Sequence, residues 1–139
     1  MTSPAIHKTT FIKASPETVW KLLTDKDLLG QWYHPAETDL AADSPYKLGS
    51  SENGEPKVWG DVLVFEPFDR LVTTFTIAPL GGRMTTVTWT LNEVEGGTML
   101  DLAHEGIAEA AAGPALDLLM ALEAGWGRHL VRLQEGATS

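Results

Sequence analysis

The chain of 139 residues contains no cysteine, which excludes thiol catalysis, thiolate metal sites and redox switching. Basic residues are few: 10 lysines and arginines stand against 19 aspartates and glutamates, and the formal net charge is -9. The electric field of this negative charge repels a nucleic-acid phosphate backbone, and no run of basic residues offsets it locally. We therefore expect neither nucleic acid nor an anionic membrane surface among the partners.

Long apolar runs are missing as well. The most apolar stretch, residues 108–124, is interrupted by acidic residues and by a Gly-Pro pair, so it is too broken to cross a bilayer as an isolated helix. Residues 1–8 lack the apolar core of a signal peptide. These two observations predict a cytoplasmic protein.

The composition that remains is typical of a globular domain, with 43% hydrophobic and 21% charged residues. At this length folding buries roughly two-thirds of the surface that the unfolded chain exposes, which is enough for a core that needs no disulfide bonds or bound metal ions. No internal repeat, linker or low-complexity tract divides the sequence. We expect a single domain over residues 1–139.

The beginning of the chain predicts a strand and two short helices. Residues 5–13 are rich in β-branched and aromatic residues, which favours a strand. Ser15 is a good N-cap and Pro16 is tolerated at the first helical position, so a helix is expected from there to about Thr24. A second short helix is expected over residues 26–31.

The middle of the chain predicts an antiparallel meander with short turns. Its segments alternate: Val87, Trp89 and Leu91 are apolar, whereas the positions between them are threonines. The sheet is therefore expected to be solvated on one face and covered on the other. The expected strands are a weak one over 46–48 within a loop-rich region, and then 58–66, 70–78, 83–94 and 98–104.

Residues 114–134 predict a helix roughly 30 Å long with an apolar stripe, large enough to cover that sheet. Gly125 and Gly127 lie inside it and favour either a close approach of neighbouring strands or a kink. The order of elements predicts an α+β fold, in which a curved antiparallel sheet surrounds the long C-terminal helix and two short helices after the first strand close one end.

Several motifs resemble those of a known family. Residues 15–25 resemble the A-x-x-x-x-V-W-x-x-L-T-D opening of the START/Bet v-like (SRPBCC) superfamily, and within it the chain is most similar to the family named for the activator of heat-shock-protein-90 ATPase. In the motif over residues 60–71, Phe68 replaces the second of two adjacent prolines, a change that we expect not to disturb the hairpin turn at residues 66–69. The further matches, in family order, are residues 31–33 (R-W-W or K-W-Y), 60–71 (G-x-V-L-x-x-x-P-P-x-R-L), 96–106 (G-G-T-x-L-x-L-x-H-x-G) and 125–133 (G-W-x-x-x-L-x-x-L).

The resemblance implies a helix-grip (START/Bet v-like) fold with a cavity between the sheet and the terminal helix. An aromatic-lined concavity with few polar groups suits a small apolar ligand. The Ala-rich residues 107–113 are a candidate lid over its mouth. The residues expected to bind the ligand are Trp32, His34, Phe75, Trp89, Leu102, His104, Leu119, Leu122, Glu123 and Trp126.

Two of these residues are weak candidates for catalysis. His104 shares its strand parity with apolar neighbours and is expected to point toward the cavity mouth, with Glu123 on the flank of the covering helix. Such a pair suits general acid–base work or the orientation of a ligand, and the alternative is a histidine hydrogen-bonded into the structure. His7 and His129 are expected at the surface. No spacing between histidines is typical of a metal site, so no metal is expected. The glycine pairs at residues 81–82 and 96–97 precede strands and do not form a phosphate-binding loop, so no cofactor is expected.

Three functions remain open at this point. The first is binding of a small apolar or amphipathic ligand in the cavity. The second is a cyclase- or hydrolase-like enzyme that uses a pocket histidine or carboxylate. The third is a co-chaperone that stimulates a heat-shock ATPase, which the resemblance allows. The expected partners are accordingly a small molecule or a chaperone, and the protein is expected to be a monomer or a homodimer.

Overall fold

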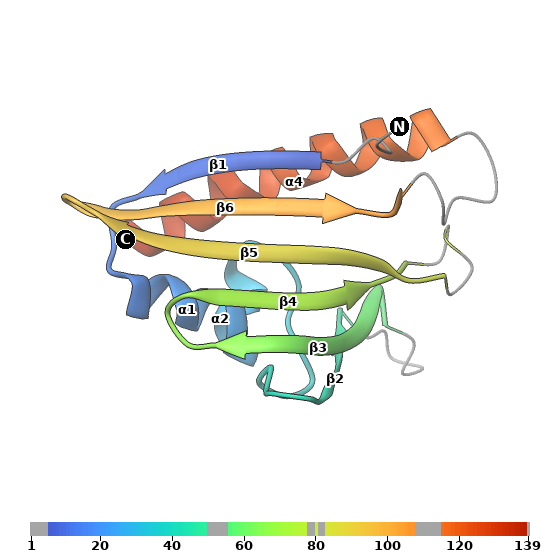
Figure 1. Ribbon diagram of the computed structural model, residues 1–139, viewed down its shortest axis with the longest axis horizontal. Coiled ribbons are helices and arrows are strands. Elements are labelled where there is room, and N and C mark those ends of the chain that lie inside the picture. Colours follow the sequence, from blue (N-terminus) through green and yellow to red (C-terminus); the bar gives the residue numbers. More distant parts are fainter. Residues whose placement is uncertain (1–5, 50–55, 78–79, 81–82, 108–114, 139) are drawn as a thin grey trace.

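The computed structural model describes residues 6–49, 56–77, 80, 83–107 and 115–138. Its elements in chain order are β1 (Ile6–Ile12), α1 (Pro16–Thr24), α2 (Lys26–Trp32), β2 (Pro45–Leu48), β3 (Val58–Glu66), β4 (Arg70–Phe75), β5 (Thr85–Val94), β6 (Gly97–Glu105) and α4 (Ala115–Thr138). The strands form one six-stranded antiparallel sheet in the order β1-β6-β5-β4-β3-β2. The curved sheet carries α1, α2 and the long α4 on one face, which confirms the predicted α+β fold (Figure 1).

Two capping residues place the short helices. The Oγ of Ser15 accepts a hydrogen bond from the backbone N–H of Thr18 at 3.3 Å and begins α1 at the predicted position. Asp25 serves both helices: its backbone N–H closes the last turn of α1, and its carboxylate accepts from the backbone N–H groups of Asp27 and Leu28 at 2.9 and 3.0 Å. One residue therefore turns the chain from α1 into α2.

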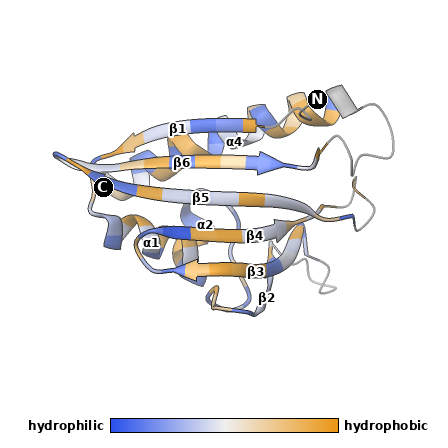
Figure 2. Ribbon diagram, in the orientation of Figure 1, coloured by the Kyte–Doolittle hydropathy of each residue, from blue (hydrophilic) through white to orange (hydrophobic). Residues whose placement is uncertain are grey.

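Side chains alternate along the central strands, and this alternation sets the layers. Val87, Trp89 and Leu91 of β5 are buried under the helices, whereas Thr86 and Thr88 between them are partly exposed on the other face. The ribbon of β5 accordingly shows hydrophobic bands separated by paler ones (Figure 2). The predicted distribution, with one covered face and one solvated face, follows from the two-residue period of the strand.

A β-bulge redirects the second half of β3. The register with β4 shifts between Val62 and Val64, and Leu63 at the shift is 52% exposed. Beyond it, Phe65 meets the ring of Trp20 edge-on, with a centroid separation of 5.1 Å. The bulge thus lets β3 contribute to the core on both sides of the shift and holds α1 against this corner of the sheet.

The β3–β4 hairpin forms at residues 66–69 as expected, through a turn that two prolines could not make. The backbone N–H of Asp69 donates to the carbonyl of Glu66 at 3.0 Å, and Phe68 has a φ of 69°. A positive φ at this position is typical of a type II turn, and proline, held at about −65°, cannot adopt it. The replacement of the motif proline by Phe68 leaves the hairpin intact but permits a turn geometry that the motif excludes.

Some expected boundaries differ from the observed ones. β4 ends at Phe75, short of residue 78, and Thr76 continues only as an isolated bridge to Trp59. α4 runs unbroken through both of its central glycines and ends at Thr138, beyond the expected end at residue 134. The proposed lid, residues 107–113, lies outside the described residues except for Ile107, which is fully buried.

Candidate functional site

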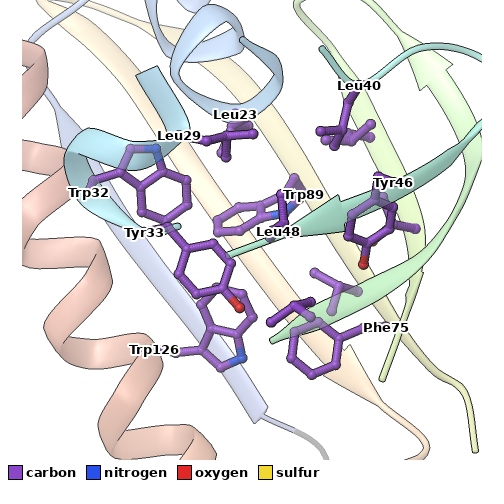
Figure 3. A pocket seen from close by; sticks show the side chains of 14 residues that line it. Leu23, Leu29, Trp32, Tyr33, Leu40, Tyr46, Leu48, Phe75, Trp89 and Trp126 are labelled. Carbon is purple, nitrogen blue, oxygen red and sulfur yellow. The ribbon is translucent and has the colours of Figure 1, made fainter. Parts of the chain in front are cut away.

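The three indole rings expected to wall a cavity meet between the sheet and the helices. Trp32 ends α2, Trp89 lies on β5 and Trp126 lies on α4. The ring centroids are 6.0 Å apart for Trp32–Trp89 and 5.6 Å apart for Trp89–Trp126, both edge-to-face. Figure 3 shows the ring of Tyr33 between those of Trp32 and Trp126, and its centroid lies 5.3 Å from each. The result is a continuous aromatic layer from α2 to α4.

The space enclosed behind this layer is small. It measures about 30 Å³, which is room for about one water molecule and not for a metabolite. The space behind this layer is therefore not the ligand-sized hollow that was expected between the sheet and α4. The physical reason is the size of the residues that point inward: besides the three indoles, the rings of Tyr46 and Phe75 occupy the space (Figure 3).

A wider cleft adjoins this small cavity. It measures about 200 Å³, which exceeds the roughly 150 Å³ of an apolar cavity known to take up benzene. Four residues line both spaces and form the wall between them: Tyr33, Val58, Phe75 and Trp126. The remaining residues of the cleft are His34, Lys57, Ile77, Ala121, Leu122, Gly125 and His129. We call this space the outer cleft.

His104 belongs to a chain of hydrogen bonds beside the cleft, which runs from Trp126 to the carbonyl of Phe75. The Nε1–H of Trp126 donates to His104 Nδ1 at 3.0 Å, which places the imidazole proton on Nε2. His104 Nε2 then donates to Thr85 Oγ1 at 2.8 Å, and this hydroxyl donates to the carbonyl of Phe75 at 2.7 Å. The ring of His104 is completely buried, and both of its nitrogens have partners.

This environment keeps His104 neutral. Burial lowers the pKa of His104 to about 4, so the ring carries no charge at pH 7. His104 lines neither the small cavity nor the outer cleft. With both nitrogens in use it has no atom free to exchange a proton with a ligand, so the structure corrects its assignment as a catalytic and ligand-binding candidate. The alternative, a histidine hydrogen-bonded into the structure, fits the geometry.

Glu123 is not in the cleft. Its side chain is 65% exposed and lies 3.8 Å from the Nζ of Lys8, at the outer side of α4 next to the edge strand β1. Leu122 lines the cleft, and each helical residue is turned by about 100° from the one before it, so its neighbour faces elsewhere. The expected pairing of Glu123 with His104 is therefore corrected.

The remaining expected ligand contacts divide between the core and the cleft. Leu102 is completely buried and lines neither space, and Leu119 is a partly buried residue packed against the core. Leu122 and His34 line the outer cleft, as do Phe75 and Trp126, which also line the small cavity. The sequence analysis therefore named four of the cleft residues.

Three polar residues line the cleft that the sequence analysis did not assign to a site: Tyr33, Lys57 and His129. His129, expected at the surface, donates from Nδ1 to the carbonyl of Trp32 at 3.2 Å. Its ring centroid lies 5.8 Å from that of His34, and the Tyr33 ring lies 4.6 Å from each. A signal for His129 was present: it follows Trp126 by three residues, which puts both on one face of a helix.

The cleft is locally cationic in an acidic protein. Burial, then the charges of His129, Lys57 and Arg132, lower the pKa of His34. Burial also lowers the pKa of His129; the carbonyl of Trp32 opposes this shift, and the charges of Arg132 and Arg128 add to it. Among the described residues that line the cleft, none is acidic.

Tyr33 contributes an uncharged phenol to the cleft wall. Burial and, to a lesser extent, Tyr46 raise the pKa of Tyr33 far above its usual value, so its hydroxyl stays protonated.

Within the described ranges, no group of three or more histidine, aspartate or glutamate side chains is placed to hold a metal ion. None of the described helices is both long and apolar enough to span a membrane.

The sheet that grips a terminal helix, with two short helices after the first strand, defines this protein as a helix-grip domain of the START/Bet v-like (SRPBCC) superfamily. Such a fold is in general that of a ligand-binding domain. Residues 13–137 match the family model described as activator of Hsp90 ATPase homolog 1-like protein, and the chain belongs to that family. No protein with a curated description matches the sequence.

Solved structures with the same fold share little sequence with this chain. A protein from Mesorhizobium loti is 22% identical with a TM-score of 0.79, and the match covers 96% of each chain. The Aha1 dimer from Colwellia psychrerythraea is 20% identical with a TM-score of 0.77, covering 97% of this chain and 96% of that one. DynU16, a putative protein in the dynemicin biosynthetic locus, is 22% identical with a TM-score of 0.76 over 96% of this chain, which spans only 46% of its length. At these identities the likeness shows the fold alone.

Proposed function

We propose that this protein binds a small amphipathic molecule in the outer cleft. The observation that carries the proposal is the cleft itself: about 200 Å³ beside α4, with an aromatic wall on one side and polar side chains at its rim. The ligand's apolar part lies against Trp126, Tyr33 and Phe75. This combination of an apolar floor and a few convergent polar groups is typical of small-molecule sites.

The size of the cleft limits the affinity. Burial of about 200 Å² of apolar ligand surface contributes roughly 5 kcal/mol before the cost of association. Binding in the micromolar range or weaker is therefore expected unless polar contacts add to it. The small inner cavity contributes only if the shared wall moves.

The proposal is tested by filling the cleft from its own helix. Gly125 lines the cleft, and a Cβ at this position would meet no atom closer than 4.0 Å, at the Arg128 guanidinium. Gly125→Leu is expected to occupy the cleft without disturbing the core. The matched control is Gly127→Leu, because Gly127 lies two residues away, lines other surface hollows and not the outer cleft, and gains the same helix propensity.

The measurement is a titration with the neutral planar probe 2-naphthamide, followed by NMR shifts of the Trp126 indole N–H. The wild type and Gly127→Leu are expected to bind equally, and Gly125→Leu at least tenfold more weakly. Equal binding by all three proteins, or no binding by any, overturns the proposal.

The family match favours a second candidate function, stimulation of a heat-shock ATPase. It is tested by adding this protein to a purified Hsp90 and measuring ATP hydrolysis. A rise in rate that survives Gly125→Leu would assign the protein to that function through another surface. The enzyme alternative depended on His104 and Glu123, which the structure does not bring together.

A further inference from the structure

We propose that the ligand of the outer cleft carries a carboxylate, which is held between His34, His129 and Lys57. This inference rests on the proposed function and specifies the polar end of the ligand. The two imidazoles flank the ring of Tyr33, with its centroid 4.6 Å from each, so a planar group on Tyr33 places its substituent beside both histidines.

The positions of Lys57 and the two histidines support this assignment. Lys57 lies next to His34, because a Cβ built on Gly49 would lie 3.3 Å from both the Cδ of Lys57 and the Cβ of His34. His129 faces them from α4, with its ring 5.8 Å from that of His34. Lys57 and the two imidazoles therefore come from three separate segments of the chain and converge on one end of the cleft.

The available hydrogen-bond donors also fit an anion. His129 already donates from Nδ1 to the carbonyl of Trp32, so a second proton on this ring sits on Nε2. Among the described residues, no hydrogen bond engages the ring of His34. Each imidazole can therefore offer an N–H to a carboxylate once it is protonated, and charge-assisted bonds of this kind are the stronger ones.

The acidic character of the whole chain does not oppose such a site. Exposed charges are largely screened beyond about 8 to 10 Å at physiological ionic strength, so the groups near the cleft dominate. The charged and titratable groups that act on the two histidines are Arg128 and Arg132 of α4, Lys57 before β3, and the histidines themselves. All of them are cationic or neutral, and a bound carboxylate relieves their mutual repulsion.

This arrangement couples ligand binding to proton uptake. In the free protein, burial and neighbouring cations disfavour protonation of both rings, whereas a bound carboxylate favours it. Binding therefore takes up protons, and the affinity for an anion falls as the pH rises. A neutral ligand of the same shape has no such dependence.

The experiment compares 2-naphthoate with 2-naphthamide, which share their ring system and differ in charge, at pH 6 and pH 8. We expect 2-naphthoate to bind about tenfold more tightly than 2-naphthamide at pH 6, with the difference largely lost at pH 8. Equal affinities at both pH values, or weaker binding of the carboxylate, overturn the inference and leave the proposed function standing. If neither probe binds, both fail.

Variants locate the effect within the cleft. Lys57→Met is expected to weaken 2-naphthoate binding about fivefold without changing 2-naphthamide binding, whereas Lys47→Met, at an exposed position on β2, changes neither. The double variant His34→Gln/His129→Gln is expected to remove the pH dependence, and His7→Gln, at an exposed position on β1, is its control. A pH dependence that survives the double variant, or is lost equally in His7→Gln, overturns the assignment.

Discussion

The buried His104 and the two histidines of the outer cleft, His34 and His129, have opposite environments. His104 is completely buried, and its two nitrogens connect Trp126 to Thr85. His34 and His129 lie at the outer cleft, where each ring retains a nitrogen that can bond to something else. The difference teaches that burial and hydrogen-bond partners, more than proximity to a cavity, decide whether a histidine is fixed in the fold or keeps a nitrogen available for another partner.

The strongest test of this comparison removes the buried ring. His104→Ala is expected to lower the free energy of unfolding by about 3 to 4 kcal/mol, because it opens a cavity and leaves the Trp126 N–H without its acceptor. Urea denaturation measures the loss. A change of less than about 1 kcal/mol would show that the hydrogen-bonded path does not hold α4 to the sheet.

Acid should act on the same path. The folded-state pKa of His104, about 4, lies below its usual value of 6.5, so the unfolded chain binds the proton more readily. Stability is full above pH 6.5 and is lost as the pH falls toward 4, by roughly 3 kcal/mol in total. The lowered pKa values of His34 and His129 add a loss of the same sign.

The contribution of His104 is isolated by comparing unfolding free energies at pH 7.5 and pH 5. His104→Gln is expected to show a smaller loss between these two pH values than the wild type, whereas His7→Gln should match the wild type. An unchanged loss in His104→Gln would assign the acid sensitivity to other groups.

A smaller effect is expected from the middle of the path. Thr85→Val removes the acceptor of the His104 N–H and is expected to cost about 2 kcal/mol. Thr86→Val is the matched control, because the neighbouring side chain points to the other face of the sheet and its change should be nearly neutral. Similar losses in the two variants would contradict the role of the path.

The smallest stability effect is expected at the cleft. His34→Gln and His129→Gln should each change the free energy of unfolding by no more than about 0.5 kcal/mol, because both rings are only partly buried. Thermal unfolding checks this directly. A loss as large as that of His104→Ala would remove the contrast between the two groups.

Much of the fold could be predicted from short stretches of sequence. The alternation around Trp89 and the cap at Ser15 placed a strand and a helix to within a few residues. These signals are local, because a strand repeats every two residues and a helix end needs a side-chain acceptor nearby. Phe68 is an example of the limit: the turn was expected, but its backbone conformation was not.

The candidate site was predicted less completely. Trp126, Phe75, Leu122 and His34 were named as ligand contacts and line the cleft. The other expected contacts were assigned from strand parity or helix spacing alone, which gives the face of an element and not the distance to a cavity. The positions of Lys57 and His129 depend on segments about seventy residues apart along the chain, and no local pattern joins them.

The sequence by itself determined the α+β fold and the family, because hydrophobic periodicity and turn residues are encoded along the chain. Only the tertiary structure decided that the indoles fill the interior and that the open space lies outside Tyr33 and Trp126. The physical reason is packing: the volume left between large side chains depends on how rings from several elements fit together, and the pattern of any single element does not contain it.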